Sequence, residues 1–291
     1  MFRLGIIGSD NSHAEAFAKL ANVETGPNKI DGVQVSCIYG TDPARTKEVA
    51  EKGKIPTIVS NTEEMLGQVD GVLCVWRHGD KHLPDTMPFI KAGIPAFIDK
   101  PLACKVADAR QLIEAALQHK IGFTSFSTLR YEPGTAEFIK TMADTGGGLT
   151  AATVSGPAHL ESEYGGIFFY GIHSVELMNA VLGYGCKTVS AIASNDNCAV
   201  TCTFGDDRIA TLNLLGNAKV DFHILAFGKN VWNQHRVDAG NAYAAGMKVF
   251  VETLQTGNWP LTAEQLLEPV QILAAIEKSL AEKRVVEIEE V

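Results

Sequence analysis

The sequence predicts an α/β chain of two domains: a doubly wound parallel sheet, then an α+β domain built on an open, mostly antiparallel sheet. Three observations predict this. A chain of 291 residues is longer than one compact core usually holds. In the first half, short apolar runs alternate with amphipathic stretches, as in parallel strands joined by helices. In the second half, strand-like runs follow one another with turn residues between them.

The first half opens with an apolar run over residues 2–8 that ends at a glycine, as expected of a buried parallel strand. A helix over 12–22 follows, with Ser12 as its expected N-cap. Asp42 and Pro43 are typical of a helix start. The remaining expected elements are strands over 33–40, 71–76, 94–99 and 121–126 and helices over 43–51, 61–66, 82–92 and 106–119.

The second half changes character after Gly146–Gly148. Its expected strands cover 149–156, 188–194, 198–204, 208–215 and 222–228, and its expected helices 134–144, 171–182, 241–256 and 262–283. We therefore expect a first domain over 1–125 and a second over 126–291, with the last helix packing back toward the first domain.

Composition excludes several classes of protein. The net charge is −9 with no cluster of Lys and Arg, so a nucleic-acid partner is not expected. No apolar run reaches about eighteen residues, and the N-terminus reads as a strand, so we expect neither a membrane span nor a signal peptide. The six cysteines form no CxxC pair, which favours free thiols in a reducing cytoplasm. No spacing of His and Cys predicts a metal site.

Five motifs stand in order along the chain: GIIG (5–8), VDGVLCVWRHGDKH (69–82), IDKPLA (98–103), STLRYEP (127–133) and GIHSVELMNAVLG (171–183). Together they resemble the motifs of the glucose–fructose oxidoreductase / inositol dehydrogenase / MocA (Gfo/Idh/MocA) family. The resemblance implies a Rossmann domain, NAD or NADP as cofactor, and hydride transfer from a hydroxyl carbon of a sugar or polyol. The choice between NAD and NADP stays open.

The same resemblance implies the site residues. Lys100 occupies the lysine of the family's Glu-Lys-Pro motif, with Asp99 in the Glu position, and His173 occupies the histidine of its Gly-x-His helix. Both are expected to be catalytic. The expected cofactor-binding residues are Gly8, Ser9, Asn11, Ser12, Trp76, His82 and Lys100.

Three functional places depart from the family's pattern. The phosphate loop keeps only Gly8 of the G-x-G-x-x-G pattern, with Asp10 and His13 at the other two glycine positions. A carboxylate at Asp10 would oppose bound phosphates by about 1–4 kcal/mol at ~4 Å; alternatively, Asp10 caps the helix. Tyr39 stands where an acidic residue usually holds the ribose hydroxyls. It could stack on an adenine, donate a hydrogen bond to a 2′-phosphate, or be an ordinary buried aromatic residue. Phe169 replaces the carboxylate expected near His173, and Glu176 is the acid that remains on that helix.

These departures leave two other functions open. One is a redox-inactive member of the family that binds a sugar-like ligand or acts as an accessory subunit. The weaker one is a metal-dependent hydrolase or isomerase using Asp10, His13, His82 and His173. We also expect a homo-oligomer, a dimer or a tetramer, formed through the apolar strands at 198–204 and 208–215.

Overall fold

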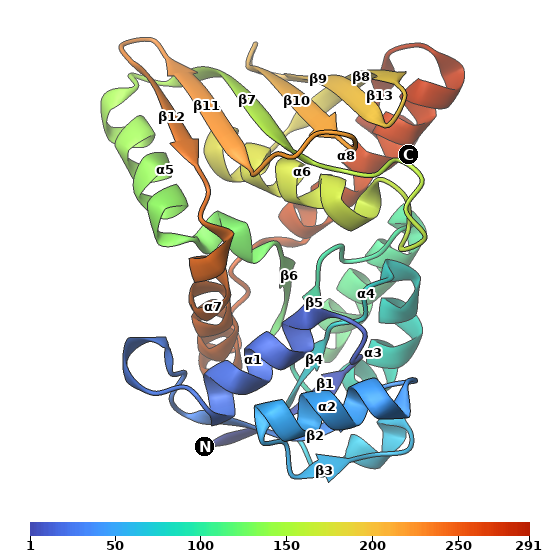
Figure 1. Ribbon diagram of the computed structural model, residues 1–291. Helices are drawn as coiled ribbons and strands as arrows, with labels where there is room; N and C mark the ends of the chain where they lie inside the picture. The colour runs from blue at the N-terminus through green and yellow to red at the C-terminus, as the bar shows by residue number, and fades with distance from the viewer. The chain divides into compact units, whose positions relative to one another are not determined.

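The computed structural model describes the backbone of residues 1–291 and the side chains of residues 1–240 and 242–291. The chain forms two compact units, whose elements are labelled in Figure 1. Unit 1 comprises Met1–Ala103, Ala107–Phe126 and Tyr243–Ala263, and unit 2 comprises Cys104–Val106, Ser127–Ala242 and Glu264–Val291.

Unit 1 is built on a six-stranded sheet with the strand order β3-β2-β1-β4-β5-β6. All neighbouring strands are parallel, which confirms the predicted doubly wound sheet. The order runs outward from β1 in both directions, as in folds that bind dinucleotides at the carboxyl edge of the sheet. The strands are β1 (Phe2–Ile7), β2 (Val33–Tyr39), β3 (Thr57–Ile58), β4 (Gly71–Cys74), β5 (Ala96–Asp99) and β6 (Phe123–Phe126).

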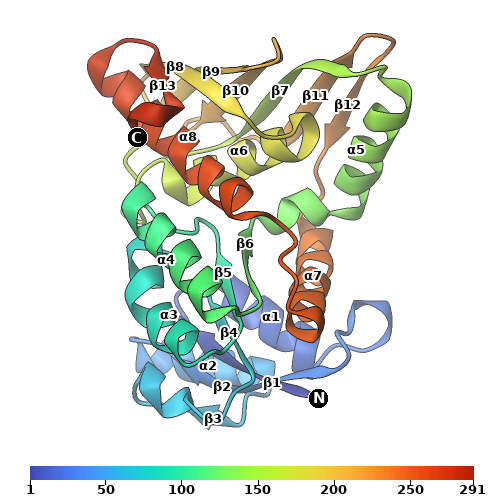
Figure 2. The ribbon, with the colours of Figure 1, turned by 180° about the vertical axis from the view of Figure 1, so that it is seen from behind.

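Helices cover both faces of this sheet. α1 (Ser12–Asn22) and α2 (Pro43–Gly53) lie in front of it in Figure 1, whereas α3 (His82–Lys91) and α4 (Val106–His119) lie in front of it in the reverse view of Figure 2. Parallel strands are joined by right-handed crossovers. Because the strand order runs in two directions from β1, these crossovers lie on opposite faces of the sheet. Short 3-10 helices complete the connections at η1 (Gly26–Asn28), η2 (Thr62–Met65) and η3 (Gly79–Lys81).

The start of α1 differs from the sequence-based prediction. Its N-cap is Asn11 and not Ser12, because the Asn11 Oδ1 accepts the backbone N–H of His13 at 3.2 Å. Asn and Ser are about equally good N-caps, so neighbouring candidates cannot be separated by propensity alone. The start of α2 was predicted correctly, since Asp42 accepts the N–H groups of Ala44 and Arg45.

Unit 2 is built on a seven-stranded sheet with the order β12-β11-β7-β10-β9-β8-β13. Only β7 and β10 run parallel, so the predicted, mostly antiparallel sheet is confirmed. The strands are β7 (Leu149–Pro157), β8 (Cys186–Ser194), β9 (Asn197–Phe204), β10 (Ile209–Leu215), β11 (His223–Gly228), β12 (Trp232–Arg236) and β13 (Val286–Glu287). The predictions missed β12 and β13: β12 is a polar edge strand, and β13 has only two residues.

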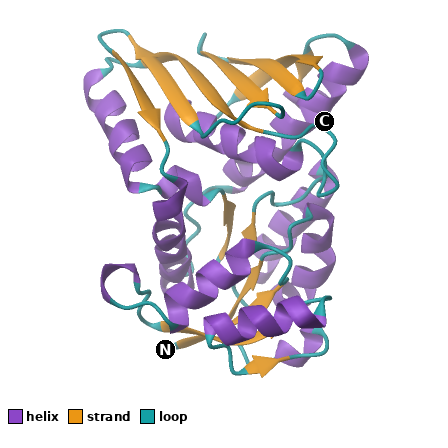
Figure 3. Ribbon diagram, viewed as in Figure 1, coloured by secondary structure: helices purple, strands orange, loops and turns teal.

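The helices of unit 2 leave one face of its sheet open. α6 (Phe168–Leu182) and α8 (Ala263–Glu282) lie on the same side of the sheet, and α5 (Pro133–Thr145) lies beside β11 and β12 (Figure 3). The strand burial pattern agrees, because side chains on the helix side are buried and their neighbours are partly exposed. Three 3-10 helices, η4 (Thr128–Tyr131), η5 (Ala239–Asn241) and η6 (Ile288–Glu290), belong to this unit.

The last two α-helices belong to different units. α7 (Ala242–Thr256), from Tyr243 onward, belongs to unit 1, whereas α8 belongs to unit 2 from Glu264 onward. In α7, the Phe250 ring packs 5.7 Å from that of Phe97 in β5. In α8, the Ser279 Oγ accepts the backbone N–H of Ala191 in β8 at 3.0 Å. Both helices are amphipathic, so periodicity alone does not say which sheet each one covers.

Candidate active site

The loop between β1 and α1 turns on Gly8. This residue has a φ of +102°, which side-chain-bearing residues rarely adopt, and a Cβ built on it would lie 2.7 Å from the backbone nitrogen of Trp76. Its N–H donates to the carbonyl of Tyr39 at 2.9 Å, so the ends of β1 and β2 are joined at this point. Glycine is therefore required at position 8 both because of the positive φ and because a Cβ atom would clash with the Trp76 backbone.

Two serines of this loop have different surroundings. Ser9 is buried, its Oγ lies 2.8 Å from the Oγ1 of Thr46, and its carbonyl accepts the Arg45 Nε–H at 3.2 Å. Ser12, at the first turn of α1, is exposed. Ser9 thus holds the loop against α2, and Ser12 remains at the surface next to a helix N-terminus, where backbone N–H groups favour an anion.

Asp10 connects two loops. Its Oδ1 accepts the backbone N–H of Arg77 at 3.2 Å, so the carboxylate points toward the loop that follows β4. The alternative in which Asp10 caps α1 is wrong, because Asn11 does so. Asp10, which stands at the second glycine position of the pattern, therefore links the β1–α1 loop to the β4–α3 loop by a hydrogen bond.

His13 and Asp99 form a buried pair. The His13 Nδ1 lies 2.6 Å from the Oδ2 of Asp99, and the Asn11 side-chain amide donates to the same oxygen at 3.1 Å. The His13 ring also meets the ring of Tyr243 at 4.9 Å, edge to face. His13 and Asp99 are both departures from the family's pattern, and the structure shows that they contact each other.

Lys100 follows Asp99 at the carboxyl end of β5, and the Lys100–Pro101 peptide bond is cis. Only 4% of Lys100 is exposed. Burial lowers its pKa, the Asp99 carboxylate opposes this change, and the Arg77 guanidinium adds to it. A lysine with a lowered pKa at the carboxyl edge of a parallel sheet is suited to accept and return a proton near neutral pH.

The side chains of Trp76 and His82, two of the expected cofactor-binding residues, are buried in unit 1. His82 is fully buried, with its Nδ1 2.8 Å from the carbonyl of Pro101 and its Nε2 3.0 Å from that of Trp76, and burial lowers its pKa. The Trp76 indole is 1% exposed and donates its N–H to Asp85 at 2.7 Å. Both rings support the loops from beneath, and Tyr39 packs edge-on against Trp76 with ring centroids 6.0 Å apart.

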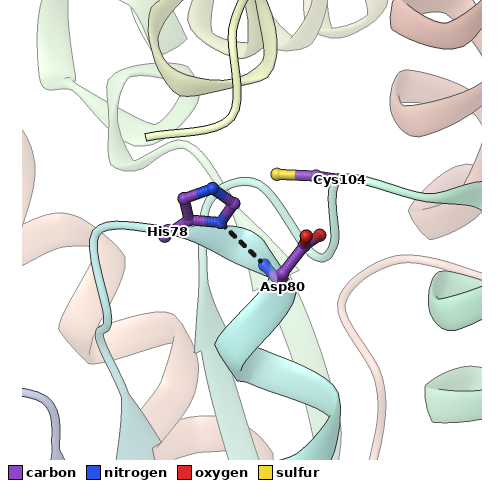
Figure 4. A group of neighbouring side chains, drawn as sticks. All are labelled: His78, Asp80 and Cys104. Carbon is purple, nitrogen blue, oxygen red and sulfur yellow. Dashed lines mark hydrogen bonds between the residues drawn. The ribbon is translucent and has the colours of Figure 1, made fainter. Parts of the chain in front are cut away.

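The polar run after β4 forms a tight turn. The His78 Nδ1 accepts the backbone N–H of Asp80 at 3.2 Å and so caps η3, as the dashed line in Figure 4 shows. Cys104, also drawn there, belongs to unit 2.

Three of the residues considered for a metal site, Asp10, His13 and His82, lie in unit 1, where each one has a different partner. His13 contacts Asp99, both nitrogens of His82 lie against backbone carbonyls, and Asp10 accepts from Arg77. Each group has a separate partner, so these three do not form a shared ligand set.

In unit 2, His173 is 7% exposed, and its Nδ1 lies 2.7 Å from the Oγ of Ser127. Ser127 also accepts the N–H of Leu129 at 3.3 Å, which fixes its hydroxyl at the start of η4. The residue beside His173 is thus a serine, which sequence reasoning missed. The sequence feature that could have pointed to Ser127 is its position as the first residue of the STLRYEP motif.

Glu176, the acid that remained near His173 in sequence, has another partner. The Arg130 Nη1 donates to its Oε2 at 2.7 Å and lies 2.9 Å from the hydroxyl of Tyr184. Burial raises the pKa of Glu176, and Arg130 opposes the rise. Arg130, from the STLRYEP motif, and Glu176 therefore form a buried ion pair within unit 2.

Aromatic side chains next to His173 border a hollow in unit 2. The Tyr170 ring lies 5.8 Å from that of His173, and Tyr170 also lines a cavity of about 740 Å³. The loop residues His159 and Glu161, which the sequence left unplaced, line the same cavity. Its volume is in the range of small-molecule sites.

Comparison with known proteins agrees with this architecture. Residues 2–125 match the Gfo/Idh/MocA model, described as an oxidoreductase family with an NAD-binding Rossmann fold. The chain is 26% identical over 129 residues to an inositol 2-dehydrogenase from Acidothermus cellulolyticus, a match that covers 44% of this chain and 36% of the relative. It is 32% identical over 117 residues to an inositol 2-dehydrogenase from Cereibacter sphaeroides, covering 39% of this chain and 32% of the relative. The matches thus span about a third of the relatives' length.

A solved structure extends the likeness of fold to the whole chain. The scyllo-inositol dehydrogenase from Lactobacillus casei, solved with NAD(H) and scyllo-inositol, superposes with a TM-score of 0.85 at 16% identity and covers 99% of both chains. Among the described residues, none of the helices combines the length and the apolar character that crossing a membrane requires.

Proposed function

Because residues 2–125 of this chain match the model of the Gfo/Idh/MocA family of oxidoreductases, we propose that the protein oxidises a secondary hydroxyl of a sugar or polyol with NAD or NADP. The observation that carries the proposal is Lys100, a desolvated lysine at the carboxyl end of β5. The relatives are named inositol 2-dehydrogenases, which supports a cyclic polyol as the substrate class.

The β1–α1 loop fits a dinucleotide. Gly8 allows the backbone to approach a phosphate closely, and the exposed Ser12 stands at the first turn of α1. Asp10 does not fill this space, because its carboxylate points to Arg77. We assign cofactor binding to Gly8, Ser9, Asn11, Ser12 and Lys100, with Ser9 and Asn11 acting by holding the loop.

A nicotinamide cofactor, when bound, would supply the hydride acceptor for this oxidation. The chain's own part is to remove the hydroxyl proton, and we assign this step to the neutral amine of Lys100. The substrate C–H and O–H bonds break, a carbonyl forms, and Lys100 becomes an ammonium. We propose His173, whose Nδ1 lies 2.7 Å from the Ser127 Oγ, as the second catalytic residue.

Turnover with a panel of cyclic polyols and aldoses tests the proposal. We expect NAD or NADP reduction, followed at 340 nm, with at least one cyclic polyol. A nucleotide at 100 times its dissociation constant should stabilise unit 1 by about 2.7 kcal/mol. Thermal stabilisation by a nucleotide without reduction of it by any substrate would instead support a redox-inactive family member.

Asp10→Asn is expected to tighten NAD binding about 5–30-fold, which corresponds to ~1–2 kcal/mol. The amide keeps an oxygen for the Arg77 N–H and removes the negative charge near the phosphates. Asp10→Gly also removes the charge but loses that bond, so we expect a smaller gain. Calorimetric titration of NAD into the three proteins measures both effects. Equal or weaker binding by Asp10→Asn would contradict the electrostatic argument.

We propose that a second copy of this chain covers the open face of the unit 2 sheet. Register places Ile209, Ala151, Phe227 and Trp232 in one row across β10, β7, β11 and β12. Trp232 is 62% exposed and Ile192, on β8, is 75% exposed. An apolar row on an open sheet face favours association.

Light scattering at micromolar concentration should give the mass of a dimer or tetramer. Trp232→Glu together with Ile192→Asp should lower it toward the mass of one chain without changing the circular dichroism spectrum. A wild-type protein that stays monomeric under these conditions would disprove this interface.

A further inference from the structure

Asp99 and Lys100 are consecutive residues at the end of β5, and both are buried, with 0% and 4% of their surface exposed. An acid and a base are thus removed from water at one strand end. In such surroundings a charge acts strongly on its neighbours because water screens it little.

The Asp99 carboxylate is held from one side. Its Oδ2 contacts the His13 Nδ1 at 2.6 Å and the Asn11 amide at 3.1 Å, both from the start of α1. Its Oδ1 has no hydrogen-bond partner among the residues whose side chains are described. The donors on Oδ2 favour the ionised form, and the other oxygen leaves its charge only partly compensated.

We propose that His13 and Asp99 are positioning residues for Lys100: their hydrogen bond keeps a negative charge on the residue that directly precedes the lysine and joins the phosphate loop to the end of β5. The proposal rests on the proposed function, in which Lys100 takes the substrate proton. It also explains two departures from the family's motifs as one pair. Histidine replaces a loop glycine, and the shorter aspartate replaces the glutamate before the lysine.

The charges around the pair act in opposite directions. Burial acts to raise the pKa of Asp99, but His13 and Lys100 outweigh it, so that the pKa falls overall. For Lys100, burial lowers the pKa, Asp99 raises it and Arg77 lowers it. The other titratable groups of unit 1 that face the pair are Tyr243 from α7, Cys74 from β4 and His82 from α3. Of the groups named here, Asp99 is the one that favours the Lys100 ammonium.

The test is to titrate Lys100 directly by NMR in protein carrying ¹³C- and ¹⁵N-labelled lysine, with the signal assigned from Lys100→Arg. Asp99→Asn is nearly isosteric, and the His13 ring can accept from the new amide, so this variant keeps the contact but not the charge. We expect the Lys100 midpoint to fall by about one pH unit. His13→Ala should also lower it, because a buried carboxylate without its closest donor takes up a proton. His13→Gln, which keeps a donor, should stay near wild type.

Asp31→Asn is the matched control. Asp31 is 86% exposed on its side chain and lies far from β5 in the sequence, so the Lys100 midpoint should not move. An unchanged midpoint in both Asp99→Asn and His13→Ala would overturn the proposal. A fall in Asp99→Asn without one in His13→Ala would overturn the role of His13.

The titration needs no substrate, so it gives an answer even if no dehydrogenase activity is found. If the protein turns over a polyol, the acid limb of the kcat–pH profile for oxidation should move to lower pH in Asp99→Asn. The direction follows because a lower Lys100 pKa leaves more neutral amine at a given pH. An acid limb that stays in place while the Lys100 midpoint falls would contradict Lys100 as the base but not the pairing with His13.

Discussion

Lys100→Ala is expected to lower kcat/KM for polyol oxidation about 10²–10⁴-fold, the usual contribution of a general base. The free energy of unfolding should change by only about 1 kcal/mol, because removing a desolvated ammonium offsets part of the lost packing. Steady-state kinetics and urea unfolding measure the two quantities. Lys91→Ala, on the exposed end of α3, is the control that should change neither.

Lys100→Arg separates proton transfer from charge. Arginine stays protonated in proteins, so it keeps the positive charge but cannot accept the substrate proton. We therefore expect it to be about as inactive as the alanine variant. An active Lys100→Arg enzyme would show that the lysine acts through its charge alone, and full activity of Lys100→Ala would remove it from the site.

Arg130→Met is expected to destabilise unit 2 by about 3–5 kcal/mol, the largest stability effect that we anticipate. The side chains of Arg130 and Glu176 are only 9% and 6% exposed, so the substitution leaves a buried carboxylate without its cation. It also removes the guanidinium that lies 2.9 Å from the Tyr184 hydroxyl. Urea unfolding followed by circular dichroism measures the loss.

The double variant Arg130→Met with Glu176→Leu tests the cause. Replacing both members of a buried ion pair by apolar side chains is often close to neutral, so we expect the double variant to be more stable than Arg130→Met alone. Arg236→Met is the matched control, because Arg236 and Asp221 form an ion pair with side chains 71% and 57% exposed, worth about 0–1 kcal/mol. A double variant no more stable than the single one would mean that Arg130 contributes by packing.

Local patterns were enough for most of the secondary structure. The expected helix over 106–119 agrees with α4 at both ends, and Asp42 was identified as the cap of α2 because its signal lies within three residues. The edge strand β12 was missed because its polar sequence lacks the alternation of a half-buried strand. It forms by antiparallel pairing with β11, and the sequence of β12 alone does not predict this pairing.

The predicted site was less complete than the fold. Lys100 and Gly8 were predicted from a strand end and a motif. The structure shows that Lys100 is buried and that Gly8 has a positive φ. His82 and Trp76 occupied motif positions as well, yet both rings are buried beneath the loops. A motif gives the residue's place along the chain but not the direction of its side chain.

The sequence by itself determined the alternation of strands and helices, the change to consecutive strands, and the residues at the carboxyl ends of the strands, because these depend on periodicity and on neighbours in the chain. Only the tertiary structure decided which side chains meet. His13 and Asp99 are 86 residues apart, and Ser127 and His173 are 46 apart. It also decided that α7, from Tyr243 onward, belongs to unit 1 and α8, from Glu264 onward, to unit 2. The physical reason is that burial and hydrogen-bond partners depend on the packing of the whole unit, which no local pattern contains.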